Sequence, residues 1–220
     1  MSAIHTLEKF DVDGALQEAI DNVDPDTRAS FLKKMGVGIG TIAVGGAFAG
    51  AIPRLASAAT PASDVAILNF ALTLEYLEAD FYAGARANAG IFKGDTRNFV
   101  AVVAGHEATH VAFLKKALGS AAIKKPKFDF KGTNNTNQKT FEATAQLLED
   151  TGVAAYLGQA GNIKTKAILA AAGSILTVEA RHAAWMRHIR QTPPAPLVFD
   201  KPKTKAQILA AVGKTGFIVG

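Results

Sequence analysis

The stretches HEATH (residues 106–110) and EARH (residues 179–182) each contain the pattern Glu-x-x-His. Residues three apart lie on one face of an α-helix, so each stretch offers a carboxylate and an imidazole side by side. Both pairs fall within apolar stripes of helical period, where a charged side chain is costly unless an opposite charge meets it. The four candidate residues are Glu107, His110, Glu179 and His182.

Two further glutamates lie in comparable apolar stripes. Glu75 and Glu149 precede the glutamates of the two Glu-x-x-His patterns by 32 and 30 residues. Each is followed by a tyrosine seven residues later, Tyr82 and Tyr156. Because the order Glu, then Glu-x-x-His occurs twice, the sequence predicts two similar helical hairpins around a pseudo-twofold axis.

This set of side chains indicates a metal site. A glutamate from each of two helices, plus Glu-x-x-His from each of two others, is the ligand set of di-iron and di-manganese carboxylate proteins. The chain has no cysteine, and carboxylate with imidazole suits iron or manganese, with zinc as a substitute. Two divalent cations would cancel the charge of four buried carboxylates. We therefore predict two Fe or Mn ions held by Glu75, Glu107, His110, Glu149, Glu179 and His182.

No catalytic residue follows from the sequence, but three side chains are expected beside the ligands: Tyr82, Tyr156 and His106. For the tyrosines, simple core packing is an alternative, and His106 could equally be a core histidine. The ligand choice also leaves alternatives open. Glu78, three residues after Glu75, competes with it, and Glu142 competes with Glu149 or adds to it.

Helical periodicity dominates the sequence from about residue 64 onward. It predicts helices at 64–88, 95–118, 138–159 and 165–190, with Ser63 or Asp64 as the first N-cap. The polar connection 119–139 is long and the other two are short. We therefore expect an all-α four-helix bundle over 59–192, with a long crossover between its second and third helices. An irregular tail, residues 193–220, should pack on the bundle and contains an amphipathic piece near 206–212.

Residues 1–58 have the layout of a leader. Residues 35–52 are uncharged and glycine-rich, basic residues precede them, and Ala56-Ser57-Ala58 is a small-residue cleavage pattern. The layout resembles a twin-arginine export signal, with Ala29 in place of the second arginine. We expect a leader helix that exports the chain. As alternatives, residues 35–52 anchor it in a membrane, or the chain stays in the cytoplasm.

The net charge of +5 invites a nucleic-acid partner, but its distribution argues against one. The lysines gather at residues 124–131 and 201–205, with no aromatic ladder or known binding motif beside them. We expect no nucleic-acid binding. Assembly into a homo-oligomer is left open.

Residues 64–190 resemble the bacterial ferritin-like domain group related to plant desiccation-associated proteins. The resemblance is carried by ILNFALTLEYLE (67–78), HEATH (106–110), LEDTGVAAY (148–156) and EARHAAW (179–185). It implies the ferritin-like fold and a di-metal centre. It does not choose an activity, because ferroxidases, manganese catalases, rubrerythrins and oxygenases share this core.

The function expected first is redox chemistry on O₂, peroxide or ferrous iron, in stress protection. A non-catalytic metal-binding or stress-protection protein is the alternative. A third reading takes residues 106–110 as His-Glu-x-x-His of a zinc metalloprotease, with His106 and His110 on zinc and Glu107 as base. That reading leaves the second Glu-x-x-His and the repeated spacing unexplained.

Overall fold

The structure is a computed structural model that describes residues 60–219. The expected leader, with residues 35–52, Ala29 and the cleavage pattern, lies outside the described residues, so export and membrane anchoring stay predictions. Among residues 60–219, no helix has both the length and the apolar character needed to cross a membrane.

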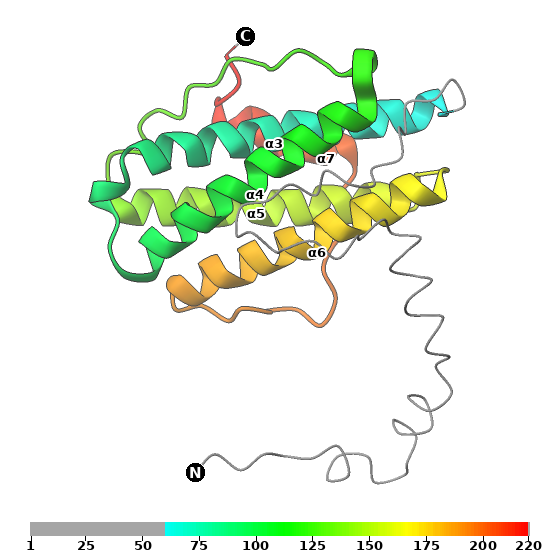
Figure 1. The fold of residues 1–220 in the computed structure, drawn as a ribbon. Coiled ribbons are helices and arrows are strands. Elements are labelled where there is room, and N and C mark those ends of the chain that lie inside the picture. The colour runs from blue at the N-terminus through cyan, green and yellow to red at the C-terminus, as the bar shows by residue number, and fades with distance from the viewer. Residues whose placement is uncertain (1–59, 220) are drawn as a thin grey trace, which may run out of the picture. The chain divides into compact units, whose positions relative to one another are not determined.

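Four long helices form the body of the described region (Figure 1). They confirm the predicted all-α bundle, with boundaries within about two residues of the expected ones. They are α3 (Ala62–Ala87), α4 (Gly94–Leu118), α5 (Gln138–Ala160) and α6 (Lys166–Ile189). Two short 3-10 turns, η2 (Ala89–Ile91) and η3 (Gly119–Ala121), follow α3 and α4.

The helices pair as two hairpins. The closest packing joins α3 with α4 and α5 with α6, while α3 also contacts α5 and α4 contacts α6. The long connection between α4 and α5 runs along the edge of the bundle in Figure 1. Each hairpin therefore carries one glutamate helix and one Glu-x-x-His helix, which is the arrangement that the repeated order predicts.

The first helix begins earlier than expected, and the prediction of Ser63 or Asp64 as its N-cap is wrong. Helix α3 starts at Ala62 after Pro61, with no side-chain cap. Asp64 instead accepts hydrogen bonds from the backbone N–H groups of Lys164 and Thr165, at 3.1 and 2.9 Å. Its carboxylate thus ties the first turn of α3 to the two residues that directly precede α6.

The apolar core consists of two clusters with a polar layer between them. Along α4, one cluster takes Phe99 to Ala104 and the other takes Leu114 to Leu118. Along α6, Ile175 belongs to one cluster and Met186 belongs to the other. Both Glu-x-x-His patterns fall between the two clusters, so their polar side chains form one layer across the bundle.

The C-terminal tail, expected to be irregular, contains helix α7 (Lys205–Thr215), which buries Ile208 and Val212 in the larger cluster. Just before α7, the Lys203 N–H donates to the Ala154 carbonyl oxygen at 3.1 Å. A Cβ at Gly158 would lie 1.9 Å from the Lys203 carbonyl oxygen. Glycine on α5 is therefore required for this close approach of the tail.

Candidate metal centre

The structure brings all six predicted ligand side chains together inside the bundle. The four glutamates are completely buried, and the two histidines are at most 9% exposed. Each helix contributes as the sequence order predicts. Helix α3 provides Glu75, α4 provides Glu107 and His110, α5 provides Glu149, and α6 provides Glu179 and His182.

The ligand atoms form two groups, in each of which all atoms lie within 4.8 Å of one another. The first, named here the His110 position, comprises Glu75, Glu107, His110 and Glu179. The second, the His182 position, comprises Glu107, Glu149, Glu179 and His182.

At the His110 position, the histidine Nδ1 atom faces three carboxylates. It lies 3.2 Å from Glu75 Oε2, 3.3 Å from Glu107 Oε2 and 3.0 Å from Glu179 Oε1. Two ligands about 2.1 Å from one metal and at right angles to each other are separated by about 3.0 Å. The spacing therefore suits ligands of one ion.

The His182 position repeats this arrangement. Its Nδ1 atom lies 3.2 Å from Glu107 Oε1, 3.2 Å from Glu149 Oε2 and 3.8 Å from Glu179 Oε2. Glu107 and Glu179 therefore present one oxygen to each position, whereas Glu75 and Glu149 serve one position each. For a bound pair of ions, the two Glu-x-x-His glutamates would be the bridging carboxylates and the other two the terminal ones.

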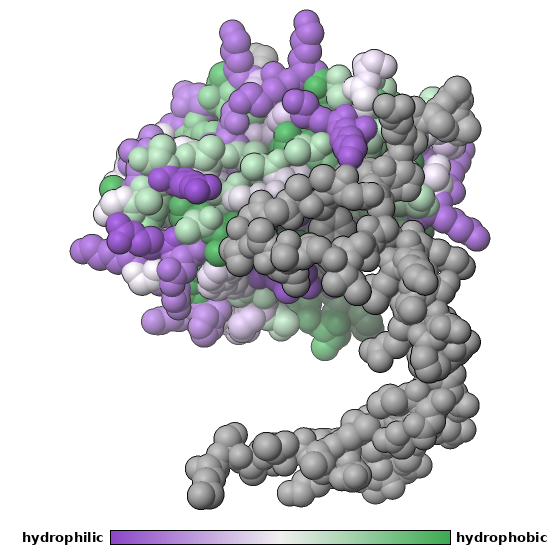
Figure 2. Space-filling model, viewed as in Figure 1, coloured by the Kyte–Doolittle hydropathy of each residue, from purple (hydrophilic) through white to green (hydrophobic). Residues whose placement is uncertain are grey.

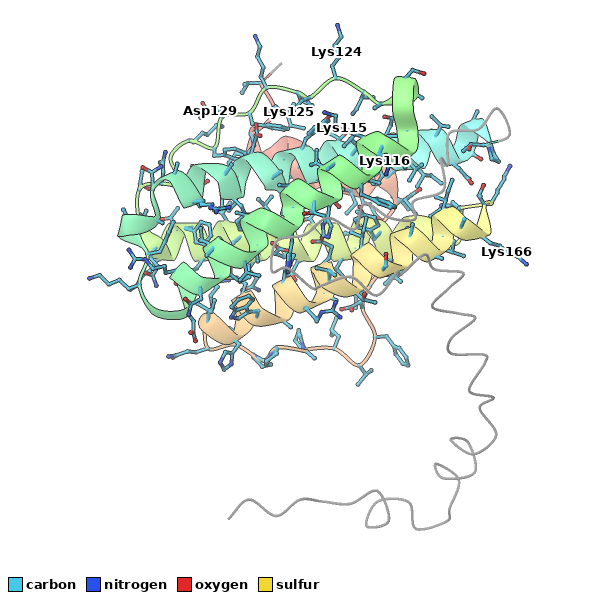
Figure 3. The ribbon with its side chains drawn as sticks, in the orientation of Figure 1. Lys115, Lys116, Lys124, Lys125, Asp129 and Lys166 are labelled. Carbon is cyan, nitrogen blue, oxygen red and sulfur yellow. The ribbon has the colours of Figure 1, made fainter. Side chains whose placement is uncertain are left out.

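Apart from His110 and His182, no positively charged side chain among residues 60–219 pairs with these carboxylates. No lysine or arginine ion pair reaches them within residues 60–219, and Figure 3 shows Lys124 and Lys166 pointing away from the bundle. Six buried atoms of the site lack a hydrogen-bond partner: Glu75 Oε2, Glu107 Oε1, Glu149 Oε2, both Glu179 oxygens and His182 Nδ1. Unpaired buried polar atoms are rare and costly. This donor set fits a pair of metal ions.

Two tyrosines hold the terminal carboxylates across the hairpins. Tyr156 on α5 donates to Glu75 Oε1 at 2.5 Å, and Tyr82 on α3 donates to Glu149 Oε1. In each case the bonded oxygen is the one that faces away from the histidine of that position. The tyrosines therefore fix the rotation of each terminal carboxylate and leave its second oxygen free for an ion.

His106 lies outside both ligand groups. Its Nδ1 atom is 2.8 Å from His182 Nε2, the nitrogen opposite the one that faces the carboxylates, and its side chain is exposed. A zinc protease site would need His106 and His110 on one ion. The geometry instead places His106 behind His182, as a support for that ring.

The two competing glutamates have different surroundings. Glu142 accepts hydrogen bonds from Thr96 Oγ1 and Gln138 Nε2, at 2.5 and 2.8 Å, and lies outside both groups. Glu78 is 3% exposed and points toward the site, beside Gly152. The sequence reasoning did not single out Gly152. Its position could have indicated it, because Gly152 lies three residues after Glu149 just as Glu78 lies three residues after Glu75.

When no metal is bound, protons on the buried side chains reduce the negative charge of the site. Burial raises the pKa of Glu149 to about 8, and it raises the pKa of Glu78 well above its usual range, with Glu179 and Glu149 adding to the effect. Burial alone would lower the pKa of His182, but the neighbouring carboxylates of Glu107 and Glu149 raise it to about 12. Metal binding must therefore displace protons from the site.

A sequence model described as a ferritin-like domain matches residues 63–192, which includes all six ligand residues and both tyrosines. No curated protein matches the chain.

Proposed function

The chain belongs to the ferritin-like domain family, and on this premise we propose that it is a di-metal carboxylate protein that uses Fe or Mn in redox chemistry on O₂, peroxide or ferrous iron. Stress protection is the proposed role. The observation that carries the proposal is the sharing of Glu107 and Glu179 between two ligand groups. Such sharing would place two bound ions close enough to act as a pair.

Different residues of the chain would have different roles in such a site. A bound pair of redox-active metal ions would supply the electrons exchanged with oxygen, peroxide or ferrous iron. Glu107 and Glu179 would hold the pair together, and Tyr82 and Tyr156 would keep the terminal carboxylates in place. The apolar clusters on both sides exclude bulk water, which strengthens the electrostatic interactions within the site.

A small apolar pocket favours a small substrate. It lies between α3, α5 and α6 and is lined by Leu68, Ala71, Leu74 and Ala155, together with Tyr156. Tyr156 lines this pocket and also bonds Glu75 of the His110 position. An apolar lining of this kind suits a small apolar molecule such as O₂.

The second candidate is a non-catalytic metal-binding protein with the same ligands. The complete burial of all four glutamates favours it, because structural metal sites are closed whereas catalytic sites keep an open coordination position. The protease reading has no comparable support, since His106 and His110 belong to no common group.

Metal analysis with activity assays distinguishes these functions. The full chain is purified from its own host and its Fe, Mn and Zn content per chain is measured. Peroxide consumption and aerobic oxidation of ferrous iron are then followed. The proposal expects two Fe or Mn ions per chain and turnover in at least one assay. Glu107→Ala should lose the metal pair and, with it, the turnover.

The other outcomes count against the proposal in different ways. Two ions without turnover would support the non-catalytic candidate. A single zinc ion with peptidase activity, lost in Glu107→Ala while zinc remains bound, would support the protease. Glu142→Ala is the matched control, since it removes a carboxylate of the same bundle from outside both ligand groups and should leave metal content unchanged.

A further inference from the structure

An apolar segment projects into solvent between α6 and α7. Leu197 is 49% exposed, Val198 is 92% exposed and Phe199 is 83% exposed. Figure 2 shows a strongly hydrophobic surface at the lower edge of the described region, where the segment between α6 and α7 runs in Figure 1. Single exposed apolar side chains are common on protein surfaces, but a contiguous group of them marks an interaction site.

The segment is fastened at both ends, and its backbone is stiff. At its start, the Thr192 N–H donates to the Arg187 carbonyl oxygen at 2.9 Å, and at its end the Lys203 N–H donates to the Ala154 carbonyl oxygen at 3.1 Å. Between these bonds, prolines occupy positions 193, 194, 196 and 202, and each proline fixes one backbone torsion. A stiff segment loses little conformational freedom when it binds a partner. The three apolar side chains are therefore held ready for contact.

Positive charge surrounds the apolar side chains. Lys201 and Lys203 follow them almost directly, are exposed, and form no ion pair within residues 60–219. Residues 187–205 contain five basic residues and a single acidic one, Asp200. An apolar group with lysines beside it is typical of a segment that enters the interface of an anionic bilayer, where the lysines meet the lipid headgroups.

A second copy of the chain suits this segment less well. A stable protein–protein interface involves about 20–30 residues and buries about 800 Å² on each partner, which is far more than three side chains provide. Two copies that met here would also bring two basic segments together, and like charges across an interface oppose association. A bilayer requires neither a large contact area nor a matching surface, because each inserted apolar side chain contributes by itself.

We propose that the three apolar side chains of residues 197–199 enter the interface of an anionic lipid bilayer. Lys201 and Lys203 then contact the anionic headgroups. The insertion is shallow, since the segment is short and its ends stay fastened to the bundle. The proposal is independent of the metal centre, and it is separate from the expected leader, because residues 35–52 would reach a membrane by another part of the chain.

Tryptophan fluorescence tests the insertion directly, because lipids with brominated acyl chains quench only the tryptophans that reach them. Full-length Phe199→Trp is mixed with vesicles of equal parts phosphatidylcholine and phosphatidylglycerol. Its emission should shift to the blue and should be quenched when the lipid is brominated. The native Trp185 is partly buried against the core, so the wild-type chain should show neither change.

Val219→Trp is the matched control. Val219 is an exposed apolar residue, 58% exposed, near the C-terminus. In Figure 1 the C-terminus lies on the opposite side of the bundle from the segment between α6 and α7. Its emission should change no more than that of the wild-type chain.

A charge variant tests the role of the lysines. Each lysine near an anionic surface contributes about fivefold to binding. Adding Lys201→Gln and Lys203→Gln to Phe199→Trp should therefore raise the vesicle concentration needed for half-maximal quenching by about 20-fold to 30-fold. The same changes at Lys124 and Lys127, in the connection between α4 and α5, should alter it by no more than about twofold, because salt screens distant charges. Vesicles of phosphatidylcholine alone should give little quenching.

Emission from Phe199→Trp that is neither shifted nor quenched by the anionic vesicles would overturn the proposal. If that variant fails to fold, as judged by circular dichroism, Val198→Trp is the second probe. Wild-type binding to vesicles without quenching of either probe would assign membrane contact to another part of the chain, such as residues 35–52. Self-association in analytical ultracentrifugation that Leu197→Ser abolishes, again without quenching, would assign the segment to a second copy. Both of these results also overturn the proposal.

Discussion

The α3–α4 hairpin and the α5–α6 hairpin provide nearly the same ligands in the same order, but they differ in what surrounds those ligands. Glu75, Glu107, His110 and Tyr82 of the first correspond to Glu149, Glu179, His182 and Tyr156 of the second. The first hairpin alone has Glu78 and His106, whose counterparts are Gly152 and Val178. Of these two, His106 contacts His182 through a ring nitrogen. The two hairpins thus provide matching ligands, but the side chains around those ligands differ.

Removal of the metal should have the largest effect, because the metal neutralises the carboxylates of both hairpins at once. At metal concentrations about 100-fold above each dissociation constant, two ions stabilise the native state by roughly 5 kcal/mol. Stripping the chain with a chelator should then lower its Tm by about 10–20 °C. Calorimetry before and after chelation measures this, and adding the metal back should restore the Tm. An unchanged Tm would show that the carboxylates are satisfied without metal.

Single glutamate variants should separate shared from unshared ligands. Glu107→Ala and Glu179→Ala remove a bridging carboxylate, so each should reduce the metal content below one per chain. Glu75→Ala and Glu149→Ala remove a terminal carboxylate, so each should leave about one ion. Metal content at matched loading is the measurement. Equal losses in all four variants would contradict the division into bridging and terminal ligands.

The tyrosines offer a direct test of the symmetry. Tyr82→Phe and Tyr156→Phe each remove one hydrogen bond to a ligand carboxylate, worth about 1.5–3 kcal/mol. Each should weaken metal binding by about 10-fold to 100-fold, at the His182 position for Tyr82 and at the His110 position for Tyr156. Metal titration resolves the two effects. Phe141→Leu, which changes a ring packed against Tyr82 and removes no hydrogen bond, is the control for core packing.

The stability of the metal-free chain should fall as the pH rises from about 5 to about 8. Glu149 has a folded-state pKa of about 8, above its ordinary value of 4.5, so the native state binds its proton more tightly than the unfolded state does. That stabilisation is complete below pH 4.5 and is lost as the pH passes through 8. The stabilisation that comes from the raised pKa of His182 is lost only near pH 12. Thermal melts of chelated and metal-loaded protein should show the fall in the chelated sample alone.

The smallest effect should come from His106, which supports only one of the two positions. His106→Ala removes the contact at His182 Nε2, and because His106 is exposed, the affinity of the His182 position should fall only about threefold to tenfold. The matched control is Val178→Ala on α6, the counterpart without a hydrogen bond. A comparable loss at the His110 position would contradict this asymmetry.

The sequence by itself determined the all-α class, the four helices within about two residues, and the six side chains that meet in the core. These follow from local rules, because helical period and a spacing of three residues fix which side chains share a face. The start of α3 was misjudged, since Asp64 does not cap its own helix but bonds the backbone of Lys164 and Thr165.

Only the tertiary structure decided which glutamates lie between the two positions, which tyrosine holds which carboxylate, and that Glu78 faces Gly152. Each of these is a contact between different helices. It depends on how the two hairpins are rotated and shifted against each other, and a helical pattern read along one chain segment carries no information about that packing.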